Sequence, residues 1–199
     1  MSSDGLEIER KWRLTRLPDR VLRADARGEE DLECWRLRQA YLPPASEADL
    51  EAAAAGPDHQ DDPNQVPAIG RIRAIETAVG PRSEVRYIHT LKSGSGLIRR
   101  EIERPLSQSA FEAAWAGTEG RRLEKTRWRI PDQGVLWEID LFEAPLAASG
   151  LVLAEAEAPS EAAAMALEPP EWLAPVVDRE VTDDPMYTNA EIAFRLGMA

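Results

Sequence analysis

Apolar and charged residues alternate along most of this chain, a pattern typical of β-strands with two different faces. The first such segment is LEIERKWRL, residues 6–14. On a helix its apolar residues would scatter around the axis, whereas on a strand Ile8, Trp12 and Leu14 share one face and the charges share the other. The same reasoning predicts eight strands in all, at roughly 5–14, 32–42, 69–76, 84–92, 97–104, 122–130, 134–142 and 150–158.

Helical signals are fewer and are scattered between and after the strands. They predict four helices, in LPDRVLRADA after Pro18, in SQSAFEAAWAGTEG with Ser107 as a candidate N-cap, in PSEAAAMALEPP, and in the tail NAEIAFRL. Residues 43–68 are rich in Ala, Asp and Pro, so we expect an exposed insertion there, with a short Ala-rich helix at 46–55. Because strand patterning continues on both sides of this insertion, residues 1–199 are interpreted as a single domain.

Many of the predicted strands carry two like charges on one face, two positions apart. The clearest pairs are Glu7/Glu9, Arg71/Arg73, Lys125/Arg127, Glu138/Asp140 and Glu155/Glu157. For any one strand, a solvated polar face is the simpler interpretation. Like charges on one face repel, so their repetition favours a shared cavity in which each pair meets counter-charges. We therefore expect an α+β fold: a closed eight-stranded antiparallel β-barrel with a charged lumen and helices packed outside.

Charge and composition narrow the classes of partner. The chain has 24 Lys and Arg against 36 Asp and Glu, a net charge of −12, which disfavours general attraction to nucleic acid or anionic membranes. Neither a signal core nor a membrane-spanning apolar run is present, so we expect a cytoplasmic protein. Cys34 is the single cysteine, which excludes an intramolecular disulfide and a cysteine-based metal site. With two histidines only, a metal would need oxygen ligands.

Two sets of charged residues define the candidate chemistry. Carboxylate oxygens suit Mg²⁺ or Mn²⁺, and the acidic set comprises Glu7, Glu9, Asp140, Glu155 and Glu157. Ammonium and guanidinium groups suit phosphate oxygens, and the basic set comprises Lys11, Arg71, Arg73, Lys92, Lys125 and Arg127. Several cations beside a metal held by carboxylates indicate phosphoryl transfer on a chain of more than one phosphoryl group.

In its charged motifs the sequence resembles the CYTH domain family, the triphosphate tunnel metalloenzymes. Glu7-x-Glu9-x-Lys11 is similar to the ExExK signature of that family. Short charged patterns arise by chance, but further blocks follow in family order over most of the chain. These blocks are RIR at 71–73, TLK at 90–92, RREIE at 99–103, EGRRLEKTRW at 119–128, WEIDLF at 137–142, LAEAEAPS at 153–160 and EVTDDPMYTNAEIA at 180–193.

The resemblance implies an eight-stranded tunnel that binds a triphosphate-containing small molecule with two divalent metals, one holding the substrate and one activating water. By this resemblance the acidic set would ligate metal and the basic set would bind the phosphate chain. Glu101 and Glu103 would hold basic residues or the second metal, and the YTNAEIAF helix would lie near one mouth of the tunnel. Residues with a catalytic role would be Glu7, Glu9, Lys11 and Lys125.

The leading hypothesis is metal-dependent hydrolysis of inorganic tripolyphosphate, because a lumen charged along its length favours a bare polyphosphate. Adenylate cyclase of the fourth class and thiamine triphosphatase share the signature and stay as alternatives. An alternative of another class is a non-catalytic module that binds polyphosphate or nucleotide. A monomer and a homodimer are both compatible with the sequence. The facing of Arg36 and Arg38 stays open, and Arg71 and Arg73 are preferred for phosphate because RIR precedes TLK.

Overall fold

The computed structural model describes residues 6–27, 32–42, 69–79, 82–93, 98–145 and 148–197. The predicted insertion at 43–68, with its short helix, lies outside these residues. The strands found within them are β1 (Leu6–Leu14), β2 (Glu33–Tyr41), β3 (Ile69–Val79), β4 (Arg82–Ser93), β5 (Ile98–Leu106), β6 (Arg122–Asp132), β7 (Val135–Ala144), β8 (Val152–Glu157) and β9 (Val177–Glu180). The α-helices are α1 (Asp19–Arg27), α3 (Gln108–Ala116), α4 (Glu161–Met165) and α5 (Asn189–Gly197).

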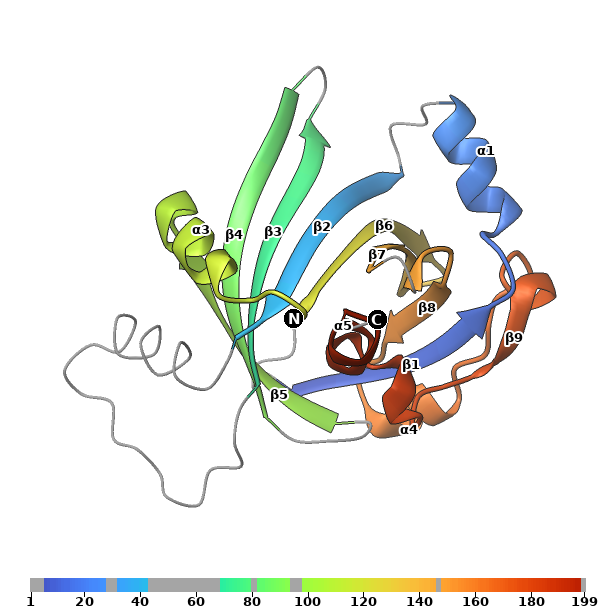
Figure 1. Ribbon diagram of the computed structural model, residues 1–199. Helices are drawn as coiled ribbons and strands as arrows, with labels where there is room; N and C mark the ends of the chain where they lie inside the picture. The colour runs from blue at the N-terminus through green and yellow to red at the C-terminus, as the bar shows by residue number, and fades with distance from the viewer. Residues whose placement is uncertain are drawn as a thin grey trace.

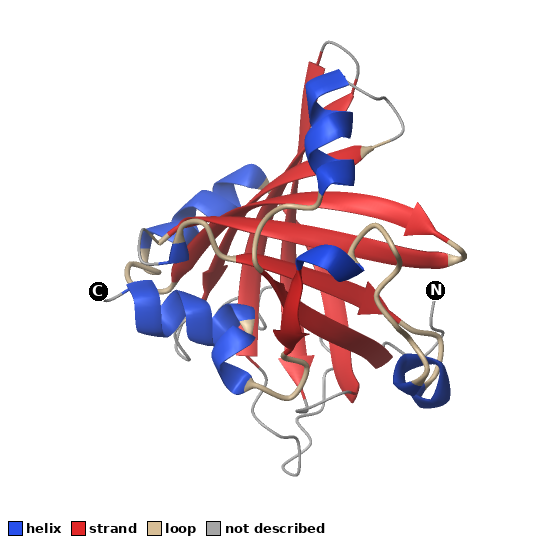
Figure 2. Cartoon of the chain, turned by 90° about the vertical axis from the view of Figure 1, so that its right-hand side faces the viewer, coloured by secondary structure: helices blue, strands red, loops and turns tan. Residues whose placement is uncertain are grey.

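All nine strands belong to one antiparallel sheet that curves around an interior (Figures 1 and 2). The strand order is β5-β4-β3-β2-β6-β7-β8-β1-β9. β1 pairs with β8 along one edge, and along its other edge it pairs first with β5 and then with β9. The contact between β1 and β5 consists of three residue pairs, Leu6–Arg100, Glu7–Arg99 and Ile8–Ile98.

The eight predicted strands all form, but the predicted closed eight-stranded barrel does not appear in that form. The described chain has a ninth strand, β9, and the two ends of the β5-to-β1 order meet only through the short β1–β5 contact. β9 is four residues long, VDRE, and three of these residues are exposed. A strand this short and this polar shows no alternation that sequence analysis could detect.

One face of β1, β6, β7 and β8 is apolar and lies under the helix α1 and the segment that precedes β9. Trp12 of β1 packs on Trp137 of β7 with ring centroids 5.3 Å apart, and Leu173 and Val176 cover the same cluster. The predicted outward, covered position of Trp12 is therefore confirmed. Elsewhere on the outer face, Phe111 and Trp115 of α3 pack with Ile72 and Ala74 of β3 in one buried cluster. Figure 1 shows α3 beside β4.

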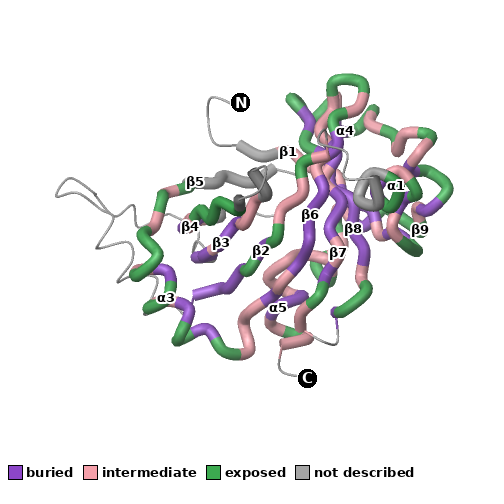
Figure 3. The backbone as a smooth tube through the Cα atoms, turned by 90° about the horizontal axis from the view of Figure 1, so that it is seen from above, coloured by how far each residue is buried: buried purple, intermediate pink, exposed green. Residues whose placement is uncertain are grey.

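Helix α5 lies on the opposite, inner side of the sheet, within its curve (Figure 1). Its Ile192 and Ala193 pack against Leu123 of β6, Phe142 of β7 and Leu153 of β8, all buried. These contacts close one end of the inner face with apolar side chains. Because β6 and β8 are covered on both faces, most of their residues are buried, as Figure 3 shows in purple.

The predicted helix starts are supported by their caps. The Ser107 side chain accepts a hydrogen bond from the backbone N–H of Ala110, and Ser160 does the same for Ala163 at the start of α4. Each cap satisfies a backbone donor that the first helical turn leaves without a partner. None of the helices in the described ranges has the length and apolar character needed to cross a bilayer.

Candidate active site

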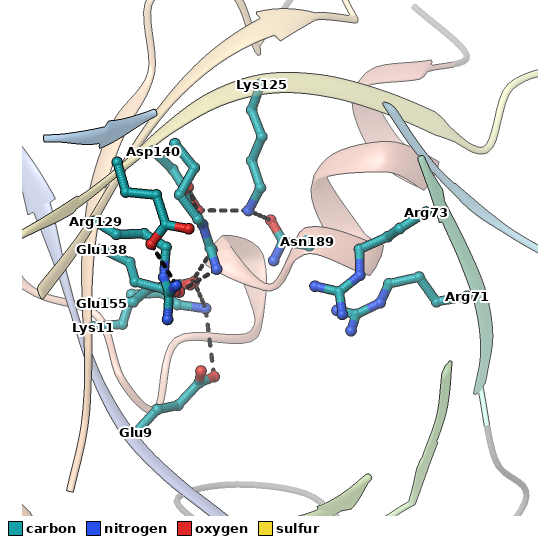
Figure 4. A network of polar contacts seen from close by, with 12 residues as sticks. Glu9, Lys11, Arg71, Arg73, Lys125, Arg129, Glu138, Asp140, Glu155 and Asn189 are labelled. Atoms are coloured by element: carbon teal, nitrogen blue, oxygen red, sulfur yellow. Dashed lines mark hydrogen bonds and ion pairs between the residues drawn. The ribbon is translucent and has the colours of Figure 1, made fainter. Parts of the chain in front are cut away.

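The strand register gathers the charged residues on the inner face. Residues directly opposite each other in an antiparallel pair face the same side. Glu9 lies opposite Glu157 and Lys11 opposite Glu155. Glu138 of β7 also lies opposite Glu155, on the strand's other edge. Figure 4 shows the side chains of Glu9, Lys11, Glu138 and Glu155 pointing into one interior. Lys125 and Arg129 of β6 join them there, and Arg71 and Arg73 of β3 lie across the interior.

Arg127 and Asp140 form a buried ion pair in this interior. Nε of Arg127 donates to Oδ1 of Asp140 at 2.6 Å, and Nη2 donates to Oδ2 at 2.7 Å, a bidentate pair. Nη2 also lies 2.7 Å from Oε2 of Glu155, and Nη1 donates to Glu138. Burial alone would lower the pKa of Arg127, but Asp140 and Glu138 raise it well above its usual value. Arg127 is therefore a fixed positive charge.

Two lysines extend the same network. Nζ of Lys11 lies 2.8 Å from Oε1 of Glu155 and 3.8 Å from Oε1 of Glu9. Nζ of Lys125 donates to Oδ2 of Asp140 at 2.5 Å and to Oδ1 of Asn189, the first residue of α5, at 3.1 Å. Burial, and next the charge of Arg127, lower the pKa of Lys125.

Glu155 is the carboxylate that links the lysine and arginine parts of the network. Its two oxygens accept from Lys11 and Arg127 respectively. Burial acts to raise the pKa of Glu155, but the charges of Lys11, Arg127 and Lys125 outweigh burial and hold the pKa well below its usual range. Glu155 is therefore ionised and serves as a counter-charge for the cations around it.

Arg71 and Arg73 provide positive charge from the opposite wall. Arg73 pairs with Glu103 of β5, and Nη2 of Arg71 lies 3.9 Å from the same carboxylate and 3.4 Å from the hydroxyl of Thr90. Burial, and next the charge of Arg71, lower the pKa of Arg73 to about 9, so Arg73 remains protonated at neutral pH. Nε of Arg73 is buried and has no hydrogen-bond partner among the described residues. A buried donor of this kind is suited to an anionic ligand.

The predicted metal ligands differ in how closely lysine and arginine side chains already engage their carboxylates. Both oxygens of Asp140 accept from Lys125 and Arg127, and its side chain is 0% exposed, so metal binding there would require these partners to be exchanged, and the metal role of Asp140 stays a prediction. Glu155 is likewise engaged by two cations. Glu9, which lies 3.8 Å from Nζ of Lys11, and Glu157 are opposite each other on β1 and β8, and their carboxylates are of the kind that suits a hard cation. Among the described side chains, no cluster of three or more potential ligands is preassembled.

Three predicted site residues have side chains outside the description, namely Glu7, Lys92 and Glu101. Their backbone positions are known: Glu7 lies opposite Arg99, and Lys92 lies opposite Glu101. Lys92 is also opposite Ile69, two residues from Arg71 along β3. The register therefore places all three on strands that border the inner face, and their roles stay as predictions.

Several inner-face residues were not among the predicted site residues. Gln39 and Tyr41 of β2 form a buried pair in which Nε2 of Gln39 lies 2.7 Å from the Tyr41 hydroxyl, and burial raises the pKa of Tyr41. The sequence alone left open which alternate residues of the segment CWRLRQAYL point into the interior. The structure settles it: Arg36 is exposed, and the Arg38 guanidinium stacks 4.6 Å from the Trp115 ring of α3 on the outer face. Arg129, Glu138 and Asn189 complete the missed residues.

Known proteins with similar sequences and structures carry related names. No protein-family model matches the sequence. An inorganic triphosphatase of Nitrosomonas europaea is 45% identical over 112 residues, which make up 55% of this chain and 70% of that protein. An inorganic triphosphatase of Acetivibrio thermocellus is 39% identical over 107 residues, 53% of this chain and 64% of that protein. The crystal structure of the inorganic triphosphatase NE1496 matches with a TM-score of 0.55 and 31% identity, and the match covers 94% of each chain.

Proposed function

Because this chain belongs to the CYTH family of triphosphate tunnel metalloenzymes, we propose that it is a metal-dependent hydrolase of triphosphate compounds, with inorganic tripolyphosphate as its substrate. The observation that carries this proposal is the convergence of cations from three strands on one interior. Lys11 and Lys125 line one side, and Arg71 and Arg73 face them from the other (Figure 4). Arg127 belongs to the first side through its hydrogen bonds to Asp140 and Glu155. A linear polyanion between the two walls would contact both sets.

The carboxylates make these cations suitable for catalysis rather than for binding alone. Asp140 fixes the Arg127 guanidinium and the Lys125 ammonium, and Glu155 fixes Lys11. Phosphoryl transfer is accelerated mainly by charges that are held in place where negative charge develops. In this proposal Lys11, Lys125 and Arg127 stabilise the charge that builds up on the phosphoryl oxygens, and Arg71 and Arg73 hold the rest of the chain.

A divalent cation is part of the proposal. Glu9 and Glu157 would hold it, together with Glu7, whose backbone lies two residues before Glu9 on the same strand. Such an ion would lower the pKa of bound water and polarise a phosphoryl oxygen. The second metal of the two-metal prediction stays a prediction, since Asp140 and Glu155 are engaged by cations of the protein.

We also propose that the β1–β5 contact completes a tunnel. It joins the first and eighth strands of the order, and β9 would then lie outside the resulting ring of eight. At one end of the inner face, α5 packs Ile192 and Ala193 against the apolar ends of β6, β7 and β8. An interior closed by apolar side chains at one end and charged elsewhere favours a short polyphosphate over a substrate with a large organic group.

The test is release of orthophosphate from tripolyphosphate, thiamine triphosphate and ATP, each with Mg²⁺ or Mn²⁺, alongside an assay for cyclic AMP. We expect turnover of tripolyphosphate and its loss in Glu9→Gln. Formation of cyclic AMP from ATP would instead identify a cyclase, and binding without turnover would identify a binding module. Full activity of Glu9→Gln, or of the wild type after chelation of metal, would overturn the metal assignment.

A further inference from the structure

The C-terminal helix contributes one polar side chain to the charged interior. Asn189 begins α5, and Figure 4 shows its amide between the Lys125 side and the Arg71–Arg73 side of the interior. The amide oxygen accepts a hydrogen bond from Nζ of Lys125 at 3.1 Å. An ammonium group only donates, so this contact orients the amide: its oxygen faces Lys125, and its nitrogen, a donor, faces away.

The position of Asn189 is fixed by the packing around it. Immediately before it, the Thr188 hydroxyl accepts from the backbone N–H of Glu191 and donates to the carbonyl of Pro185. Immediately after it, Ile192 and Ala193 are buried against β6, β7 and β8. Because the backbone around Asn189 is fixed in this way, the Asn189 side chain can hold a hydrogen-bond partner in one position.

Lys125 depends on such a partner to present its charge in one direction. Its ammonium has three donors, and two of them are directed by Asp140 and Asn189. Asp140 also accepts a hydrogen bond from Arg127, so Asp140 alone does not determine where the Lys125 ammonium points. With both acceptors in place, the third donor remains for a substrate oxygen.

We propose that Asn189 is a positioning residue, which holds Lys125 in its phosphate-binding orientation and makes α5 part of the active site. This inference rests on the proposed function, in which Lys125 contacts the phosphate chain. Asn189 then acts on the reaction through Lys125, and its contribution disappears when Lys125 is absent.

The test is a double-mutant cycle read by kcat and KM for tripolyphosphate. Asn189→Ala is expected to lower kcat/KM by about tenfold or more, because a hydrogen bond to a charged group is lost. In the Lys125→Ala background the same substitution should lower it by less than about twofold. Arg195→Ala, an exposed position on α5, is the matched control and should retain wild-type values.

Asn189→Asp gives a second readout that a purely structural role would not produce. It keeps an acceptor oxygen for Lys125 but adds a negative charge at the phosphate chain, so KM should rise while the thermal midpoint stays close to that of the wild type. Unchanged kinetics for Asn189→Ala, or equal losses with and without Lys125, would overturn the inference. Absence of tripolyphosphate turnover in the wild type would instead overturn the proposed function, and the inference with it.

Discussion

At the scale of single residues, Asp140 organises the interior by neutralising two cations at once. Its oxygens accept from Lys125 at 2.5 Å and from Arg127 at 2.6 and 2.7 Å, and it is completely buried. Removing one partner from a buried ion pair leaves the others charged in a medium that solvates them poorly. Loss of the Asp140 carboxylate is therefore expected to lower the free energy of unfolding, whatever its effect on the reaction rate.

Asp140→Asn should lower the free energy of unfolding by about 3–5 kcal/mol, the usual cost of breaking a buried pair. Denaturant unfolding followed by tryptophan fluorescence measures this loss. Asp178→Asn serves as the matched control, because Asp178 pairs with Arg13 at 3.3 Å on the surface and such pairs contribute about 1 kcal/mol or less. Equal losses for the two variants would show that the Asp140 network contributes little to the fold.

Arg73 and Arg36 offer a comparison of the two faces of the sheet. Arg73→Ala removes a cation from the interior, so KM for tripolyphosphate should rise by about tenfold or more, the value of a charge-assisted hydrogen bond. Arg36 is exposed on the outer side, and Arg36→Ala should leave KM unchanged. Steady-state kinetics on both variants decide whether phosphate is bound on the inner face, since an unchanged KM for Arg73→Ala would remove it from the site.

At the scale of elements, α5 is tied to β6 at its first residue and lies close to the turn before β6 at its last. Asn189 holds the first end, and at the last end a Cβ built on Gly197 would lie 2.8 Å from the carbonyl oxygen of Gly120. That distance is too short for any side chain, so the helix approaches Gly120 only because residue 197 is glycine.

Gly197→Ala should displace the end of α5 from the backbone at Gly120 and destabilise the protein by about 1–3 kcal/mol, the range for overpacking a close contact. Gly117→Ala is the control, since the nearest atom to a Cβ there is 3.9 Å away and the backbone φ is −88°. Differential scanning calorimetry should show a lower thermal midpoint for the first variant only; equal midpoints would mean that the helix end adjusts freely.

An element could be predicted from the sequence when its alternation of apolar and polar residues extended over several positions. The eight longer strands and the cap at Ser107 carry periodic or positional signals, and all of them form. β9 has one apolar residue in four and was missed. For the site, alternation identified which residues share the inner face, but it carries no information about pairing, so the engagement of Asp140 by Lys125 and Arg127 needed the structure.

At the scale of the whole molecule, the charge of the chain and the charge of the interior differ in character. The chain carries a net charge of −12, whereas Lys11, Arg71, Lys125 and Arg127 are all buried. A polyanion must therefore reach these buried cations within a protein that is negatively charged as a whole. Long-range attraction does not help it, and recognition depends on contacts at short range, where screening by salt is weak.

A ligand that binds only the folded state stabilises it. Tripolyphosphate at about 100 times its dissociation constant should add about 2.7 kcal/mol to the free energy of unfolding. Thermal melting with tripolyphosphate and Mg²⁺, compared with tripolyphosphate and a chelator, measures this gain and its dependence on metal. Orthophosphate at equal concentration is the control and should give a smaller shift, because it spans only one wall of the interior. Equal shifts would argue against a site for a phosphate chain.

The pairing of Glu155 with Lys11 and Arg127 has a consequence for how ligands assist one another. Each cation of the interior already has an internal counter-ion, so a phosphate chain binds by exchange, taking over cations that carboxylates hold in its absence. In the proposed metal-dependent reaction, the carboxylates released in this way would gain affinity for a divalent cation, and a bound cation would in turn release the lysine and arginine side chains for phosphate. Coupling of this kind is reciprocal by thermodynamic necessity. Metal and substrate would then each raise the affinity of the protein for the other, because each would free the charged side chains that bind the other.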